Sequence, residues 1–425
     1  MNNSFITIIK SNKTLIRGGA FSVFSFTNKG LAFLLLIVLA NYITPAEFGK
    51  LSLYGTVTQF LGYFVALSTT GFFSISYFQR KGELFKKDFS SITAITVVCT
   101  LVLCAILCFN SNTISHYADI PTLFLSIAII TSFFQVFMNL FLDYERVKEN
   151  ILNYGLINCG FAILSFILSI YLVGTLNFGW SGRVYAQLLC TTIFGMIGII
   201  VFAKKGLFTI KFNWKDTKAI LLWGIPLIPH EATTWIKQGC DRYIINASHS
   251  IEDVGLFSFA LTLTSVVIIV GMSFNATNSV SIYKILSSND TSESKALQLK
   301  KLKNNLFCIY VIGFILILLG GTILVNYLLP KYSPSLPFFW ITSISGFLQC
   351  IYFIYVNYLF YYRKNFRIMN ITFFTSVIHL ILSLILTRYS LYYTSIIYIL
   401  SQGIVLFLIR HYSIKELRIK QYASR

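Results

Sequence analysis

The sequence has few charged side chains: Asp, Glu, Lys and Arg together make up 12% of its 425 residues. Soluble domains carry about 25% charged residues, so a soluble protein of this length would lack the polar surface that it needs. The apolar residues come in runs of about 20, the length of a helix that crosses a ~30 Å hydrocarbon core. We therefore predict an all-α integral membrane protein.

Several site signatures are also missing. The sequence holds no GxxxxGK[ST] stretch and no soluble region to carry one, which excludes direct use of ATP at a phosphate-binding loop. The eight cysteines lie inside or at the edge of apolar runs, without paired spacing. We interpret them as small buried side chains and expect neither a disulfide framework, nor a metal site, nor a bound cofactor.

The apolar runs predict about twelve transmembrane helices, because a segment in lipid must satisfy its own backbone hydrogen bonds. The first residues lack the features of a cleavable signal peptide, and we expect residues 5–13 to lie on the cytoplasmic surface as an amphipathic segment. The expected spans are 18–42, 52–78, 89–110, 120–142, 151–173, 181–203, 219–245, 254–282, 304–327, 336–361, 367–388 and 391–410.

The basic residues indicate the orientation of these helices. The formal net charge of +19 does not point to nucleic acid, because Lys and Arg gather in the gaps at every second membrane exit and at both termini. The opposite gaps hold Lys50, Lys331 and Arg388, with Arg183 near that side. This asymmetry places the basic side, and with it both termini, in the cytoplasm. We expect a multi-pass protein of the bacterial inner membrane.

An internal repeat predicts two halves. Residues 47–54 (EFGKLSLY) and 253–260 (DVGLFSFA) share the spacing of an acid, a Gly, apolar residues and a Ser, and each follows the first helix of its half. Repeated halves around a central site are a common transporter architecture. We predict an N-terminal six-helix lobe at 1–203, a cytoplasmic linker at 204–218 and a C-terminal six-helix lobe at 219–425.

Three stretches carry a family resemblance: LANYITPAEFGKLSLYGTVTQFLGYFVALSTTG at 39–71, GIPLIPHEATTWIKQGCDRYIINASHSIEDVGLFSFALT at 224–262, and PKYSPSLPFFW at 330–340. With them the chain resembles the bacterial polysaccharide flippases, including O-antigen flippases, of the multidrug/oligosaccharidyl-lipid/polysaccharide exporter superfamily. The resemblance implies two lobes around a central cavity that opens alternately to each side of the membrane.

The same resemblance implies the substrate and the energy source. The substrate class is an undecaprenyl-pyrophosphate-linked oligosaccharide, and a proton or sodium gradient would drive its transport. The expected partners are this lipid-linked oligosaccharide, the membrane, a polysaccharide polymerase and the chain-length machinery, with no nucleic acid.

Two lysines within predicted spans are candidates to bind substrate. Lys29 lies about 16 Å into the first span by the rise of an α-helix, and Lys237 lies in the seventh span, at nearly the offset of the internal repeat. Equivalent helices of the two lobes would then each present a cation, which suits a pyrophosphate. The alternative is that each lysine pairs with a carboxylate on a nearby helix.

The seventh span, 219–245, has the densest cluster of polar residues. Lys237 and Arg242 are its candidate substrate-binding cations, although Lys237 is also spaced to pair with Asp241 and Arg242 lies near the helix end, where it can reach the interface. His230, Glu231 and Asp241 are the candidates for ion coupling, because a desolvated carboxylate can titrate in a useful range. A satisfied buried pair is the alternative for each of them.

Two further ionisable residues have structural interpretations. His379 is alone on an apolar span, and we expect it to make a helix–helix hydrogen bond. Arg183 lies at a helix start, where we expect an interfacial anchor.

Two functions of other kinds remain open. A membrane polysaccharide polymerase would be an enzyme, but such proteins display catalytic residues on a large outer loop, and no outer gap is much longer than ten residues. A multidrug or toxic-cation exporter needs acidic and aromatic residues in its cavity. Lys29, Lys237 and Arg242 favour an anionic substrate instead. We therefore expect a transporter and no enzymatic activity, with other lipid-linked glycans as alternative cargo.

Overall fold

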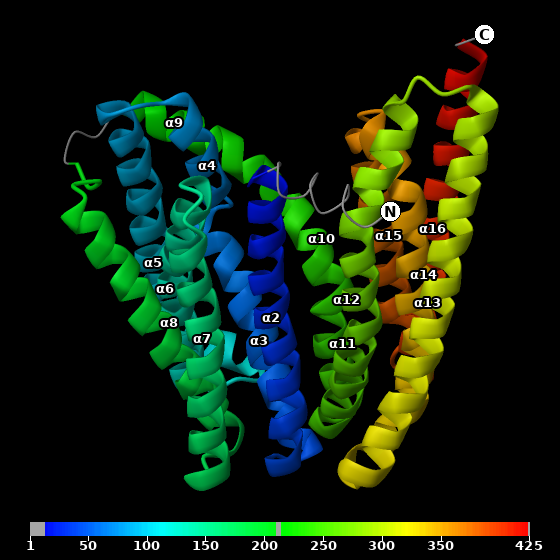
Figure 1. The fold of residues 1–425 in the computed structure, drawn as a ribbon. Helices are drawn as coiled ribbons and strands as arrows, with labels where there is room; N and C mark the ends of the chain where they lie inside the picture. Colours follow the sequence, from blue (N-terminus) through cyan, green and yellow to red (C-terminus); the bar gives the residue numbers. More distant parts are fainter. Residues whose placement is uncertain (1–12, 210–213, 424–425) are drawn as a thin grey trace. The chain divides into compact units, whose positions relative to one another are not determined.

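The computed structural model describes residues 13–209 and 214–423, and in these ranges the chain consists of helices and their connections, without strands (Figure 1). Residues 5–12 of the expected amphipathic segment lie outside the described residues. The elements are α2 (Lys13–Tyr42), α3 (Pro45–Ala66), α4 (Thr70–Gln79), α5 (Glu83–Ala118), α6 (Thr122–Val147), α7 (Ile151–Ile170), η1 (Tyr171–Thr175), α8 (Gly179–Lys204), α9 (Trp214–Gly224), η2 (Ile225–Leu227), α10 (Ile228–Gln238), α11 (Cys240–Ser248), α12 (Ile251–Ser287), α13 (Ser292–Leu328), η3 (Pro330–Ser335), α14 (Leu336–Tyr361), α15 (Asn365–Leu386) and α16 (Leu391–Ala423).

The predicted membrane fold is confirmed. In the part of the chain that the structure describes, 10 helices are long and apolar enough to cross a membrane, or 11 when the bent pair α3 and α4 counts as one span. The other expected span, 219–245, is broken into α9, η2, α10 and α11, none of which exceeds 11 residues. Because crossing the hydrocarbon core as a helix takes roughly 20 residues, no single piece is long enough to do so.

The chain forms two compact units. Unit 1 comprises residues 1–43 and 50–232, and unit 2 comprises 44–49 and 233–425. The boundary between 232 and 233 falls inside α10, and the short segment 44–49 at the start of α3 belongs to unit 2.

In unit 1, α6 packs on α8 and α5, and α2 packs on α7. An aromatic core that includes Phe73 on α4, Phe89 on α5 and Phe202 on α8 joins these three helices. On α8, the Arg183 Nη1 atom donates to the hydroxyls of two serines of α7, at 2.7 Å and 3.1 Å. Arg183 thus ties two helices of the unit together, in addition to lying near a helix start.

A charged cluster holds α4, α5 and α9 together within unit 1. The Arg80 guanidinium lies 2.9 Å from a carboxylate oxygen of Asp88 and 2.9 Å from one of Asp216. The Asp88 side chain is buried, and it also accepts a hydrogen bond of 2.5 Å from Ser76. Because a buried carboxylate needs both charge and hydrogen-bond partners, this cluster keeps α9 attached to the rest of the unit.

In unit 2, α14 packs against α12 on one side and α16 on the other, and α15 packs on α16. The segment 44–49 also belongs here, because the Phe48 ring packs against Phe259 and Tyr332 with centroids 5.6 Å and 5.9 Å apart. All three of these rings are fully buried.

The two stretches of the internal repeat begin their helices in the same way. At the start of α3, Thr44 and Glu47 exchange hydrogen bonds between side chain and backbone, and at the start of α12, Ser250 and Asp253 do the same. Each exchange satisfies two backbone N–H groups that a helix start leaves without a partner. The repeated sequence pattern therefore encodes one local structure twice.

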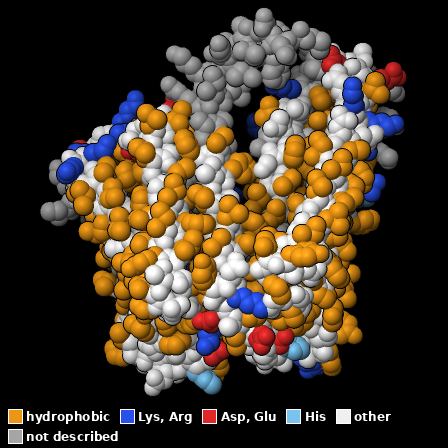
Figure 2. Space-filling model, turned by 60° about the horizontal axis from the view of Figure 1, so that its bottom comes forward, with side chains coloured by type: hydrophobic (Ala, Val, Ile, Leu, Met, Phe, Trp, Pro, Cys, Tyr) orange, Lys and Arg blue, Asp and Glu red, His pale blue; other side chains and the backbone are white. Residues whose placement is uncertain are grey.

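Hydrophobic side chains dominate the described surface. Figure 2 shows that they cover the sides of the face drawn, while Lys, Arg, Asp and Glu side chains gather toward its ends. Exposed large apolar residues occur on the long helices of both units. A continuous apolar flank of this kind fits a hydrocarbon environment rather than water.

Candidate transport site

The broken segment α9–α11 carries most of the candidate site residues. Pro226 lies in the 3-10 turn η2 and Pro229 in the first turn of α10, so the breaks fall where prolines remove backbone donors. Gly239 separates α10 from α11, and its N–H donates to the Trp235 carbonyl at 2.6 Å. The polar residues on either side of Gly239 therefore belong to two different helices.

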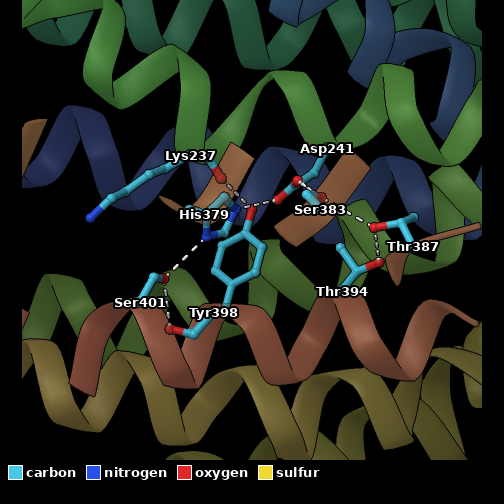
Figure 3. Close-up of polar contacts among 8 residues, drawn as sticks. All are labelled: Lys237, Asp241, His379, Ser383, Thr387, Thr394, Tyr398 and Ser401. Atoms are coloured by element: carbon cyan, nitrogen blue, oxygen red, sulfur yellow. Dashed lines mark hydrogen bonds and ion pairs between the residues drawn. The ribbon is translucent and has the colours of Figure 1, made fainter. Parts of the chain in front are cut away.

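Asp241, in the first turn of α11, is fully buried in unit 2. Its Oδ2 atom lies 2.9 Å from Nε2 of His379, and its Oδ1 atom accepts a hydrogen bond of 2.5 Å from Ser383. Both partners are on α15 and are themselves buried, at 1% and 0% exposure. Figure 3 shows the carboxylate directed at both partners. Since a lone carboxylate is costly in a membrane interior, these bonds are what allows Asp241 to be buried.

The hydrogen bonds continue from this pair in two directions (Figure 3). His379 Nδ1 lies 3.1 Å from the Ser401 hydroxyl, on α16. On the other side, Ser383 lies 3.1 Å from the Thr387 hydroxyl, which accepts from Thr394 at 2.9 Å. The result is a polar chain that crosses from α11 through α15 to α16 inside an apolar unit.

His379 stands at the centre of this polar chain, because each ring nitrogen of an imidazole can take part in a hydrogen bond. One ring nitrogen faces a carboxylate and the other a hydroxyl, so Asp241 and His379 can share a proton while the Ser401 hydroxyl holds the second ring nitrogen in place. Among the residues that the structure describes, no group of three His, Cys, Asp or Glu side chains could hold a metal ion. The pair is therefore a buried acid and a buried base joined by a hydrogen bond.

Lys237 on α10 and Arg242 on α11 are the two candidate cations of unit 2. Tyr398 donates to the Lys237 carbonyl at 2.7 Å, while the Lys237 ammonium points away from the Asp241 carboxylate (Figure 3). Arg242 donates from Nε to the Ser258 hydroxyl, on α12, at 3.0 Å. The possible i, i+4 ion pair of Lys237 with Asp241 is thus replaced by a bond of Asp241 to another helix.

Unit 1 contains a polar cavity of about 380 Å³ between α3, α6 and α8. Its lining combines amide and hydroxyl side chains with a few small or apolar residues and one carboxylate. The lining residues are Gly55, Thr58, Gln59, Gly62, Tyr63, Ala66, Ser68, Thr70, Thr131, Ser132, Gln135, Val136, Asn139, Gln187 and Glu231.

The charged residue of this cavity has a partner. Ser68 donates to the Glu231 carboxylate at 2.9 Å. The amides bond to neighbours along their own helices: Gln135 donates to Asn139 at 3.0 Å, and Gln59 donates to the Tyr63 hydroxyl at 2.9 Å. Amides and hydroxyls present both donors and acceptors, so this cavity can bind a neutral, hydroxyl-rich ligand such as a sugar.

The predicted site residues are thus divided between the units. Lys29 is exposed on α2 and Glu231 faces the cavity, both in unit 1, whereas Lys237, Asp241 and Arg242 are in unit 2. His230 lies in α10, but its side chain is outside the part of the chain that the structure describes. The structure brings Asp241 together with His379, and it assigns Asp241 and Glu231, two candidates from one predicted span, to different units.

Sequence reasoning missed two features of these sites. His379 was expected to bond to another helix, which is confirmed, but not to Asp241; a buried acid and a buried base in apolar spans, each needing a partner, were the available signal. The cavity amides were also missed. Gln135 and Asn139, spaced by four on an otherwise apolar span, lie on one helix face and indicate a surface that does not meet lipid.

Comparison with known proteins finds a family and a curated relative that match this chain. Residues 18–283 match the model of a family described as polysaccharide biosynthesis protein. The chain is also 25% identical over 389 residues to Lsg locus putative protein 1 of Haemophilus influenzae, covering 89% of this chain and 91% of that protein.

Solved transporter structures share the fold. An inward-facing multidrug resistance MATE family transporter of the MOP superfamily matches with a TM-score of 0.74 and 13% identity, covering 94% of this chain and 96% of that one. The lipid II flippase MurJ, in an inward closed conformation, matches with a TM-score of 0.71 and 15% identity, covering 93% and 87%. At sequence identities this low, the structural similarity shows a shared fold.

Proposed function

Because the chain belongs to the polysaccharide biosynthesis protein family, we propose that it is a flippase for undecaprenyl-pyrophosphate-linked oligosaccharides. It would move an O-antigen unit, or a similar surface polysaccharide unit, from the cytoplasmic to the outer leaflet by alternating access. The protein acts as a transporter and performs no bond chemistry on its cargo.

The observation that carries this proposal is the polar cavity of unit 1. Its lining offers the four amides Gln59, Gln135, Asn139 and Gln187 together with hydroxyls, while its carboxylate already accepts from Ser68. A cavity for organic cations should attract them with acidic and aromatic groups. Neutral donors and acceptors match the hydroxyls of an oligosaccharide better, which favours the glycan over a cationic drug.

The cations proposed to bind the pyrophosphate are Lys29, Lys237 and Arg242. Lys29 is exposed on α2, so its ammonium is available to a ligand. Arg242 donates through Nε to Ser258, and its guanidinium is the third cation to test against phosphate oxygens. Guanidinium and ammonium groups are the usual partners of phosphate oxygens.

Energy coupling is proposed to run through protons at the Asp241–His379 pair. Exchange of a proton at this buried pair changes the bonds that join α11 to α15 and α16, and protonation of a buried His pair is a known way to bias a conformational equilibrium. Glu231 and His230 are the second choice for a proton site, and sodium is the alternative ion. No metal cofactor is part of the proposal.

The proposed location is the bacterial inner membrane, with both termini in the cytoplasm, as the distribution of Lys and Arg predicts. Lipid-linked oligosaccharide would be received at the cytoplasmic leaflet. The polysaccharide polymerase and the chain-length machinery would take it over at the outer one.

The test is deletion of the gene in its native host, followed by analysis of surface polysaccharide and lipid-linked intermediates. A flippase loss removes the surface polysaccharide and leaves single units on lipid in the cytoplasmic leaflet. Wild-type protein from a plasmid restores the surface polysaccharide. Lys29→Ala or Lys237→Ala does not restore it at equal membrane abundance, whereas Lys301→Ala, a change at an exposed lysine outside the site, does.

Other outcomes would replace the proposal. Single units that reach the surface without polymerisation would show that flipping is intact and that the chain is a polymerase. Normal glycan together with new sensitivity to cationic drugs would make it a drug exporter. For the coupling step, Asp241→Asn should retain the bond from Ser383 but abolish the acceleration of flipping by an imposed proton gradient in proteoliposomes. An unchanged response would remove Asp241 from the coupling mechanism.

A further inference from the structure

Unit 2 has a groove that the proposed transport mechanism does not use. It lies between α13, α14 and α16 and encloses about 580 Å³, a volume in the range of small-molecule sites. The residues of the polar chain around Asp241 and His379 do not line it. Apart from Asn304, its lining consists of a basic group and an apolar group, which occupy different levels of the helices.

The basic group consists of Lys303 on α13 and Arg410 on α16. The Arg410 guanidinium carbon lies 5.9 Å from the ring centroid of Tyr355, another lining residue on α14. None of the described residues that line this groove is acidic. Two cations that face one cavity without a lining carboxylate are suited to an anionic group.

The apolar group lies deeper than the cations. On α13, Phe307 follows Lys303 by one helical turn, a rise of about 6 Å away from the basic end, and both residues line the groove. On α16, which runs in the opposite direction, Phe407 and Gly403 precede Arg410. By the same helical rise, Gly403 lies about 10 Å below Arg410. Both helices therefore place charge at one end of the groove and apolar surface toward the membrane interior.

The floor of the groove has room for a ligand. A Cβ atom added at Gly403 would meet no heavy atom within 4 Å. Phe307 and Phe407 beside it are 45% and 70% exposed, so their rings face the groove and the surrounding lipid. An amphiphile with an anionic head matches this layout: its head lies between the cations and its hydrocarbon chain along the aromatic rings.

We propose that this groove binds an anionic phospholipid of the cytoplasmic leaflet, with the phosphate held by Lys303 and Arg410 and an acyl chain lying over Gly403. Basic pockets between transmembrane helices on the cytoplasmic side recognise such head groups. The charge complementarity and the depth of the apolar floor favour a membrane lipid over a free phosphate, which would leave the apolar part of the groove without an occupant.

The test is native mass spectrometry of the purified full-length protein, titrated with phosphatidylglycerol and with phosphatidylethanolamine of identical acyl chains. Phosphatidylglycerol should bind more tightly. Since each Lys or Arg near the membrane surface contributes about 1 kcal/mol, Lys303→Ala and Arg410→Ala should each weaken binding about fivefold, and the double variant about 25-fold. Lys301→Ala, on the same helix but outside the groove, is the matched control and should bind like wild type.

A second pair of variants tests the acyl-chain part of the groove. Gly403→Trp should abolish binding by filling the floor, whereas Gly320→Trp, also at a position with no heavy atom within 4 Å of an added Cβ, should leave it intact. Melting temperatures show that each variant is folded. Equal binding of the two lipids, or equal losses in Lys301→Ala and Lys303→Ala, would overturn the proposal.

One more result separates the membrane lipid from the transport substrate. Undecaprenyl phosphate that displaces phosphatidylglycerol at lower concentration would identify the carrier lipid as the occupant, and the phospholipid proposal would be wrong. Because this assay measures binding alone, its outcome is independent of whether the protein proves to be a flippase.

Discussion

Gly49 and Gly255 occupy matching positions of the internal repeat, and the backbones around them pack directly against each other. A Cβ atom at Gly49 would overlap with the Ile251 carbonyl oxygen, and one at Gly255 would overlap with that of Pro45. Ile251 and Pro45 are themselves equivalent, since each is the first residue of its helix. The two helix starts thus make the same contact in both directions, which is the pattern of an isologous pair.

Replacing either glycine by alanine should destabilise the protein. Backbone atoms cannot move aside as a side-chain tip can, so Gly49→Ala or Gly255→Ala should cost about 1–3 kcal/mol, as overpacking does. Thermal unfolding of the detergent-solubilised variants measures the effect. Gly30→Ala is the matched control: nothing lies within 4 Å of the added Cβ, and alanine favours the helix, so its melting temperature should stay level or rise. Equal melting temperatures of the three variants would show that the two helix starts do not approach each other this closely.

Removing His379 should destabilise unit 2 strongly. His379→Ala leaves the Asp241 carboxylate buried with Ser383 as its remaining α15 partner, and loss of one member of a buried pair costs about 3–5 kcal/mol. Membrane abundance and melting temperature should both fall. The exposed His411→Ala serves as the control. Adding Asp241→Ala to His379→Ala should recover part of the lost stability, because the double variant no longer buries the charge. A double variant whose loss of stability equals the sum of the two single losses would contradict the pairing.

The cavity amides should contribute to glycan export without supporting the fold. Gln59→Ala, Gln135→Ala and Gln187→Ala each remove a neutral hydrogen-bonding group, worth about 0.5–1.5 kcal/mol. Each should lower the rate of glycan appearance at the cell surface roughly twofold to tenfold at unchanged abundance. Gln298→Ala, which alters an amide bonded within the start of α13, should have no effect. Normal export in all the cavity variants would place glycan binding elsewhere.

The charged cluster around Arg80 should matter more for stability than an exposed ion pair nearby. Arg80→Ala removes the cation that faces the buried Asp88 and, since Arg80 is itself one-third exposed, should cost about 2 kcal/mol, less than a fully buried pair. Lys86→Ala breaks the exposed pair with Glu83 and should cost about 0.5 kcal/mol or less. Chemical or thermal unfolding of the two variants measures both losses of stability. Equal losses would contradict a special stabilising role of the cluster.

The fold could largely be predicted from the sequence because long apolar runs have one structural outcome in lipid. The runs at 89–110, 151–173 and 304–327 all lie inside observed helices. Pro226 and Pro229 are a signal of the same local kind for the break at the start of α10, since proline removes a backbone donor wherever it occurs, although the expected span 219–245 was continuous. These signals are local, so they can be interpreted one segment at a time.

The partners of Asp241 could not be predicted in the same way. Spacing along one helix suggested Lys237, one turn earlier, but Gly239 ends α10 between them. The actual partners, His379 and Ser383, come from a helix that lies far along the chain. Helical periodicity predicts which residues share a face, but not which distant helix that face meets.

The position of Asp241 also has a consequence for how the chain enters the membrane during synthesis. The segment α9–α11 is broken and polar, and the α15 residue that pairs with Asp241 lies 138 residues further along the chain. At about 5–20 residues per second, ribosomes need roughly 7–28 seconds to make that stretch. For this time the carboxylate has to stay in water or at the insertion machinery, so the seventh span would settle in the bilayer after helices that follow it in the sequence.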